Sequence, residues 1–204
     1  YDRFSGGNTL LKPEKAKSSN LGIVFEPTQN TSIGIDYFSI NKTNEIGLVL
    51  AQFVIDNVAY TAGTTTTLGG NAAFSVTRNA GGTITSLNTS LGNLGERRIR
   101  GFDFSTNNRW KVADTNWSFA SNTTYYAKYD YADQPGTPLY GRLGLLNLPR
   151  WKSTFSLGAS YQAWDANLAY TTMGKMADKQ QSTAATPVAS TDRVIGNFNT
   201  VDLG

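Results

Sequence analysis

The feature that most constrains this chain is an alternation of apolar and polar residues that recurs along much of its length. In residues 151–161 the odd positions are mostly apolar, among them Trp151, Phe155 and Leu157, while the even positions carry Lys, Thr, Ser and Gly. A period of two is typical of a β-strand, whose successive side chains point to opposite faces. The sequence predicts seven such strands, at about 15–26, 31–42, 97–110, 117–130, 151–162, 166–175 and 199–204.

The lengths of these strands and of their connections indicate a membrane barrel. Most of the strands match the roughly 9–11 residues that cross a bilayer on a tilt, whereas globular strands average about 5–6. The connections alternate between tight turns near 27–30, 111–116 and 163–165 and long segments at 43–96, 131–150 and 176–198. A β-sandwich has no reason to alternate so regularly. The pattern therefore predicts an all-β, antiparallel, up-and-down transmembrane β-barrel in which each strand pairs with the next.

Composition narrows the function mainly by what is missing. The 204 residues include no Cys and no His, which excludes disulfides, thiol catalysis, histidine-based triads and ordinary zinc sites. The net charge of +3 comes with no basic run long enough to indicate nucleic acid binding. The chain contains no stretch of roughly 18 apolar residues, so no transmembrane helix is predicted. We expect a protein that is not an enzyme and that needs no metal and no cofactor.

The alternation also assigns strand residues to faces. The residues expected on a shared, lipid-facing side are Leu21, Ile23, Phe25, Phe155, Leu157 and Leu168. Those expected on the inward side are Asn20, Gly22, Asp36, Ser156 and Gly158. A shift of one residue would exchange the faces. Asp36 and Asp103 could form an acid/base pair in a soluble enzyme, but in a barrel we expect both to face the wet lumen.

The longest connection, 43–96, has a pattern of its own. Residues 74–78 and 83–85 alternate on either side of the Gly-containing segment 79–82, which predicts a small hairpin. Residues 64–67 and 69–70 are expected to be flexible. Loops of this length are usually functional or disordered.

Several segments resemble those of TonB-dependent receptors, in the order that the family has them. Residues 8–18 contain the run Lys12-Pro13-Glu14, similar to a segment that precedes a barrel strand in that family. The segments 21–28, 33–38, 100–104, 147–151 and 200–203 resemble the strands and strand starts that follow. The resemblance implies that residues 1–204 are a block near the C-terminal end of a 22-stranded barrel. The plug domain and the final strands then lie outside the chain, and its first and last strands are expected to be open edges.

The same resemblance implies an active-transport receptor of the bacterial outer membrane. Such receptors bind a scarce solute (a ferric siderophore, haem, cobalamin or an oligosaccharide) through extracellular loops and import it with energy supplied through TonB. The implied partners are the transported small molecule, the lipid bilayer with its lipopolysaccharide, and TonB through the missing N-terminal region. Two other classes stay open: a passive porin-type channel, and a soluble β-sandwich adhesin or binding protein.

Candidate site residues fall into two groups. The expected ligand-binding residues, in long loops and at their bases, are Tyr60, Arg78, Arg97, Arg98, Tyr140 and Arg142. The expected aromatic girdle at the membrane interface consists of Trp110, Trp117, Tyr129, Tyr131 and Trp164. The charge cluster 96–100 has two interpretations: a contact to an anionic ligand or lipopolysaccharide phosphate, or a solvated barrel rim.

Overall fold

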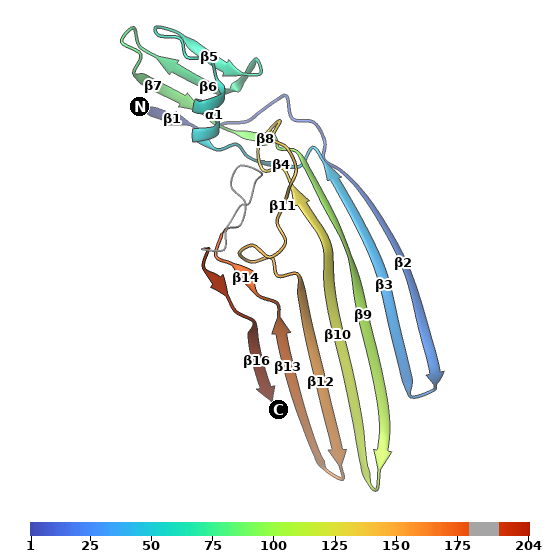
Figure 1. The fold of residues 1–204 in the computed structure, drawn as a ribbon. Helices are drawn as coiled ribbons and strands as arrows, with labels where there is room; N and C mark the ends of the chain where they lie inside the picture. The colour runs from blue at the N-terminus through green and yellow to red at the C-terminus, as the bar shows by residue number, and fades with distance from the viewer. Residues whose placement is uncertain (180–191) are drawn as a thin grey trace. The chain divides into compact units, whose positions relative to one another are not determined.

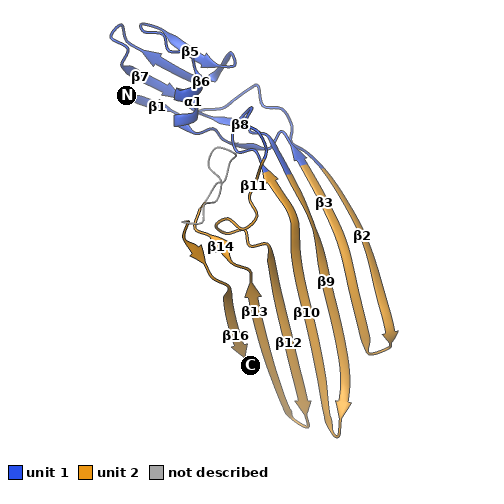
Figure 2. Ribbon diagram, viewed as in Figure 1, with its two compact units in different colours: residues 1–16, 42–97, 131–139 blue, residues 17–41, 98–130, 140–204 orange. Residues whose placement is uncertain are grey.

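The computed structural model describes residues 1–179 and 192–204, which form two compact units (Figure 2). Unit 1 comprises residues 1–16, 42–97 and 131–139, and unit 2 comprises residues 17–41, 98–130 and 140–204. The connection expected at 176–198 falls partly on residues 180–191, which lie outside the described residues.

Unit 2 is built on one long antiparallel sheet (Figure 1). Its main strands are β2 (Lys15–Thr28), β3 (Thr31–Thr43), β9 (Glu96–Val112), β10 (Thr115–Tyr131), β12 (Trp151–Tyr161), β13 (Trp164–Met173) and β16 (Phe198–Leu203). They lie in the order β2-β3-β9-β10-β12-β13-β16, so each pairs with the next long strand of the sequence, and the short β11 (Tyr140–Gly141) also pairs with β10. The seven predicted strands and their meander order are confirmed, with ends that move by only a few residues.

Tight turns join these strands at one end of the sheet (Figure 1). The residues left between the strand ends are Gln29 and Asn30, Ala113 and Asp114, and Gln162 and Ala163. Ala113 and Gln162 have φ angles of 51° and 52°, the left-handed conformation that two-residue hairpin turns use. Because such turns leave no room for a crossover, the antiparallel order follows from them.

One face of the sheet carries a ladder of apolar side chains. Phe119 stacks on Phe155 at a ring-centroid distance of 6.5 Å, and Phe155 stacks on Tyr170 at 6.2 Å. In the same registers Leu157 pairs with Phe119 on one side and with Leu168 on the other. Phe155, Leu157 and Leu168 therefore share a face, as their spacing predicts.

The opposite face is lined by small and polar residues. A side chain at Gly22 would collide with Oδ1 of Asp36, and one at Gly158 would collide with Oγ of Ser118, so each pair lies on one face. Ser156 Oγ hydrogen-bonds the side-chain oxygen of Asn167 on the neighbouring strand at 3.0 Å. The partition into an apolar and a polar face agrees with the sequence, while the assignment of the apolar face to lipid stays a prediction.

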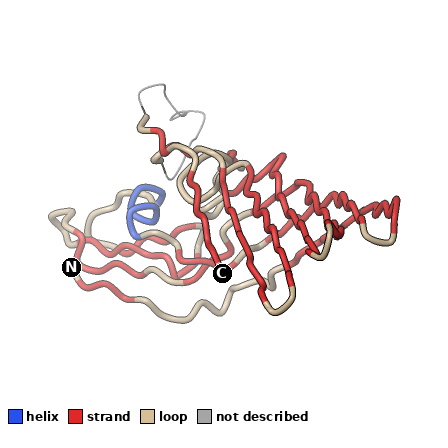
Figure 3. The backbone as a smooth tube through the Cα atoms, turned by 90° about the horizontal axis from the view of Figure 1, so that it is seen from below, coloured by secondary structure: helices blue, strands red, loops and turns tan. Residues whose placement is uncertain are grey.

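The described sheet is an open strip (Figure 3). Strands β2 and β16 each pair with one neighbour along it. Every residue of β2 is exposed, including Leu21, Ile23 and Phe25. These are the open edges expected from the sequence, where backbone N–H and C=O groups lack a partner strand.

Unit 1 has a core of the kind found in soluble domains. A four-stranded sheet in the order β1-β7-β6-β5 consists of β1 (Asp2–Phe4), β7 (Ile84–Asn88), β6 (Asn71–Arg78) and β5 (Thr65–Leu68). The other elements are α1 (Ala51–Asn57) and the antiparallel pair β4 (Ile46–Leu48) and β8 (Leu91–Asn93). The buried apolar cluster is Val49, Val54, Phe74, Val76, Leu87 and Leu94.

Unit 1 confirms one expectation about the long connection and overturns another. The predicted hairpin is present as β6 and β7. The expected flexibility at 64–67 is wrong, because β5 pairs with β6 there and Thr65 Oγ1 lies 2.8 Å from Thr77 Oγ1. Flexible-looking Thr and Gly residues instead make an edge strand and a turn, with Gly69 and Gly70 at positive φ. The helix α1 was not predicted at all.

The segment that resembles the family motif holds unit 1 together. The backbone N–H of Lys12 donates to Asn93 Oδ1 at 2.8 Å, and Asn93 Nδ2 donates back to the carbonyl of Lys12 at 2.8 Å. Glu14 Oε1 accepts the N–H of Ile46 at 2.5 Å. Asn8 Nδ2 donates to the carbonyl of Leu91 at 2.9 Å. The Lys-Pro-Glu run thus fixes both strands of the β4–β8 pair.

Candidate ligand-binding surfaces

Arginine–tyrosine pairs recur among the candidate residues. A guanidinium over an aromatic ring is attracted by the negative face of the ring. The distances from the guanidinium carbon to the ring centroid are 4.7 Å for Arg78 and Tyr60, 4.6 Å for Arg97 and Tyr131, and 5.9 Å for Arg142 and Tyr140. The structure therefore brings together residues that the sequence suggested separately.

Tyr60 and Arg78 meet beside the β6–β7 hairpin of unit 1. Arg78 Nη1 donates a 3.1 Å hydrogen bond to the carbonyl of Gly82, and within the described residues its buried Nε has no hydrogen-bond partner. Gly82 has a φ of +85°, and any side chain on it would strike the Tyr60 hydroxyl. Arg78 therefore organises the turn, whereas Tyr60, which is 68% exposed, is the part of the pair that a ligand can reach.

Arg97 belongs to a network of charges that joins separate segments of unit 1. Its Nη2 lies 2.6 Å from Glu45 Oε1. Lys42 Nζ lies 3.9 Å from Glu45 Oε1 and 3.8 Å from Glu14 Oε2. Two carboxylates thus neutralise two cations, and Arg97 is engaged by Glu45 as well as by the ring of Tyr131. The prediction that Arg97 binds ligand remains a prediction.

The same network affects the acidity of the Tyr131 phenol. Tyr131 is the last residue of β10 and a member of unit 1. Burial raises the pKa of its phenol, the carboxylates of Glu45 and Asp133 raise it further, and Arg97 acts in the opposite direction. The phenol therefore stays protonated at neutral and mildly alkaline pH and keeps its O–H as a hydrogen-bond donor.

Tyr140 and Arg142 lie in unit 2, on and beside β11. The backbone N–H of Arg142 donates a 2.8 Å hydrogen bond to the carbonyl of Tyr129, which ties this segment to β10. Arg98 belongs to unit 2 as well, on β9. Two arginines and two tyrosine rings thus lie in this part of unit 2, with the Tyr140 hydroxyl buried. The guanidinium groups suit an anionic solute.

The expected girdle tryptophans lie at the turn end of the long sheet. Trp110 and Trp117 stack across β9 and β10 with ring centroids 6.4 Å apart and an interplanar angle of 11°. Trp164 begins β13 and is 79% exposed. Tyr129 packs edge-on against Tyr126 at 6.4 Å. The role of these rings at a membrane interface stays a prediction.

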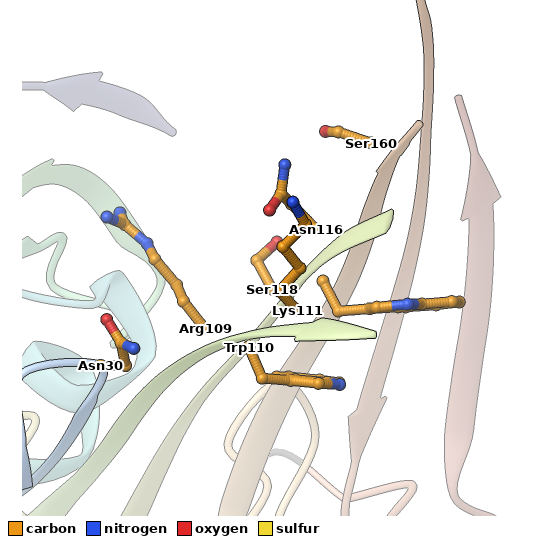
Figure 4. Close-up of a pocket in the computed structure, with 8 residues that line it drawn as sticks. Asn30, Arg109, Trp110, Lys111, Asn116, Ser118 and Ser160 are labelled. Atoms are coloured by element: carbon orange, nitrogen blue, oxygen red, sulfur yellow. The ribbon is translucent and has the colours of Figure 1, made fainter. Parts of the chain in front are cut away.

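Unit 2 also contains two hollows of about 330 Å³ each. The one at the turn end is lined by Asn30, Arg109, Asn116, Ser118 and Ser160, together with the two stacked tryptophans and Lys111. Figure 4 shows Arg109 and Trp110 on opposite sides of β9. The second hollow is lined by Tyr126, Lys152, residues of β10 and β12, and the segment 147–149. Beside it, Asp103 accepts a 2.5 Å hydrogen bond from Thr124.

Sequence reasoning missed the residues that act over long distances along the chain. Glu45 and Lys42 carry the charge network, and the buried Gln134 accepts the N–H of Leu50 at 3.1 Å, at the start of α1. No local pattern marks these residues, because their partners lie tens of positions away. Glu14 was the exception, since it belongs to the Lys-Pro-Glu run.

In residues 1–179 and 192–204, no group of three or more His, Cys, Asp or Glu side chains could hold a metal ion. The one helix in the same ranges is too short and too polar to be a membrane-spanning helix.

Comparison with known proteins identifies the family. The family model described as TonB dependent receptor-like, beta-barrel, matches residues 1–204, and the chain belongs to this family. No curated protein matches. The fold is similar to the siderophore receptor PirA from Acinetobacter baumannii, with a TM-score of 0.60 and 19% identity over 98% of this chain and 26% of that one.

Two structures of the ferric enterobactin receptor PfeA from Pseudomonas aeruginosa are also similar. One mutant gives a TM-score of 0.59 and 16% identity over 98% of this chain and 24% of that one. Another, in complex with enterobactin, gives 0.57 and 16% over 98% and 25%. At these identities the likeness shows the fold alone, and the chain spans about a quarter of the length of these receptors.

Proposed function

We propose that this chain is part of an active-transport receptor of the bacterial outer membrane. The observation that carries the proposal is the strip of seven antiparallel strands, six of them 10 to 17 residues long, with two-residue turns at one end. The receptor-barrel family matches the chain throughout. Strands of this kind span an outer membrane only as members of a closed barrel. The chain then contributes seven neighbouring strands, and the strands that pair with β2 and β16, the plug and the TonB-contacting segment lie outside residues 1–204. Nothing in this role calls for catalysis.

The transported solute that the surfaces favour is an anionic iron chelate with aromatic groups. The reachable ring of Tyr60 offers stacking, and the Arg142 guanidinium beside the ring of Tyr140 offers positive charge. The solved neighbours are named as siderophore and ferric enterobactin receptors, which supports the same class. Haem, cobalamin and oligosaccharides remain the alternative solutes of the scaffold.

The proposal is tested with the full-length receptor in its own bacterium under iron limitation. Uptake of radioactive iron as a ferric catecholate is expected to fall to background when the receptor is deleted and equally when TonB is deleted. Tyr60→Ala is expected to weaken binding, whereas Tyr161→Ala, at the turn end of the sheet, serves as the matched control. Uptake that persists without TonB but vanishes without the protein would instead favour the passive channel.

A further inference from the structure

We infer that a hollow on the apolar face of unit 2 is a binding site for a phosphorylated, acylated glycolipid of the outer leaflet, the chemistry of lipopolysaccharide. The inference rests on the proposed function, since it requires that this face meets lipid. A receptor barrel touches outer-leaflet lipid all around, and the inference assigns one defined binding site within that contact.

The hollow lies where β12 begins and β13 ends. It has a volume of about 340 Å³, at the lower end of the roughly 300–1,000 Å³ typical of small-molecule sites. Its walls are mostly apolar, with Leu143, Trp151, Met176 and Val194 among them. A concave apolar surface of this size fits the start of a hydrocarbon chain better than it fits a polar solute.

The side chain of Trp151 shows which face the hollow occupies. Trp151 has the same strand parity as Phe155, whose ring belongs to the aromatic ladder. A side chain on Gly174 would lie 2.8 Å from Trp151 Nε1, so the indole covers a position that glycine leaves empty. The hollow is therefore on the apolar face, at the end of the sheet opposite the two-residue turns. In barrels with short periplasmic turns, that end meets the outer leaflet.

Two cations border the apolar walls. Arg150 and Lys175 both line the hollow and both are exposed. Within residues 1–179 and 192–204 neither forms an ion pair. An apolar cavity with two cations at its border is complementary to an amphiphile whose acyl chain enters the cavity and whose phosphate meets the guanidinium and ammonium groups. An uncharged lipid would leave both cations without a counter-charge.

The test uses the full-length receptor purified in detergent and titrated with fluorescent lipopolysaccharide that carries phosphorylated lipid A. Arg150→Gln with Lys175→Gln is expected to weaken binding about thirtyfold, the size expected for two interfacial cations. Lipopolysaccharide stripped of its phosphates should bind the unaltered receptor as weakly as the variant binds the intact lipid. Gly174→Val should push the indole of Trp151 into the hollow and weaken lipopolysaccharide binding without changing the charge. Val194→Ser, a milder change in the same wall, should weaken binding less. The control is Arg109→Gln with Lys111→Gln at the opposite end of the sheet, which is expected to bind normally.

The outcomes that would overturn the proposed lipopolysaccharide site are distinct. Equal binding by all the variants overturns the site, and so does phosphatidylglycerol that competes as well as lipopolysaccharide, since the hollow would then accept any anionic lipid. Iron uptake by the same variants separates this inference from the proposed function. Variants that import iron normally and bind lipopolysaccharide like the unaltered receptor overturn the site alone. An unaltered receptor that is absent from the outer membrane overturns both the site and the proposed function.

Discussion

The two units bury their apolar residues in opposite ways. Unit 1 gathers Val54, Phe74 and Leu87 into a core that excludes water, as a soluble domain does. In the long strands of unit 2, by contrast, none of the described Val, Leu, Ile or Phe side chains is fully buried. Leu157 and the ring ladder lie at the surface of the sheet. The same apolar residue types are therefore packed inside unit 1 and left at the surface of the sheet in unit 2.

This difference shows what each unit needs in order to be stable. Unit 1 gains its hydrophobic free energy from its own packing. The sheet of unit 2 leaves one apolar face and two edges without a partner among the described residues. Under the proposed function, lipid covers that face and further strands pair with β2 and β16. The following changes, made in the full-length receptor, test the comparison from the largest expected effect to the smallest.

The largest effect is expected in the core of unit 1. Leu87→Ala should destabilise that unit by about 3–5 kcal/mol, because Leu87 is fully buried and its loss leaves a cavity. Hydrogen exchange of β6 and β7 should accelerate while exchange in β12 and β13 is unchanged. Leu91→Ala is the matched control, since Leu91 is about half exposed. Equal effects of the two substitutions would show that unit 1 has no water-excluding core.

The second test concerns the two faces of the long sheet. Leu157→Arg should cost about 2–4 kcal/mol in a lipid bilayer, and Ser156→Arg on the opposite face should cost far less. Urea unfolding in lipid vesicles, followed by tryptophan fluorescence, measures both. If Ser156→Arg proves the more damaging change, the faces have been assigned the wrong way round.

The third test concerns the charge network of unit 1. Glu45→Gln should destabilise the unit by about 1.5–3 kcal/mol, because the largely buried carboxylate holds Arg97 at 2.6 Å. Asp130→Asn removes the pair with Lys128, at 2.9 Å, from a more exposed position, and should cost only about 0–1 kcal/mol. Protease resistance of unit 1 measures the first change. Full resistance in Glu45→Gln would contradict a structural role for the network.

The smallest effect is expected from the stacked tryptophans. A double-mutant cycle with Trp110→Leu and Trp117→Leu should give a coupling of about 0.5–1.5 kcal/mol in unfolding experiments. The control is a cycle of Trp117→Leu with Trp164→Leu, where additive behaviour is expected. Additivity in both cycles would mean that the stack contributes nothing beyond the separate burial of its rings.

The strands of unit 2 could be predicted because their determinants are local. Alternation around Phe155 and Leu157 fixes both the strand and its faces, and the tight turns fix which strands pair. Unit 1 was harder because its segments alternate only briefly. The sequence 51–57 is too short for a clear helical period, and the run of threonines at 64–67 resembles a flexible linker until β6 pairs with it.

The residues of the candidate sites also fall into those that the sequence could select and those that it could not. Arg97, Tyr60 and Arg142 could be selected from the sequence as cations and rings in long connections, and Trp151 could be placed on the apolar face by its parity. Their partners could not be selected. Glu45 and Arg97 are 52 positions apart, and Gln134 lies 84 positions from Leu50.

The sequence by itself determined the class of fold, the order of the long strands and the family. A period of two and the lengths of the turns act within a few residues and need no knowledge of the rest of the chain. Only the tertiary structure decided that Arg78 organises a turn, that Arg97 is held by Glu45, and that Gly174 and Trp151 shape a hollow with Arg150 and Lys175. Such contacts join residues whose separation along the chain is fixed by topology, and no local pattern records them.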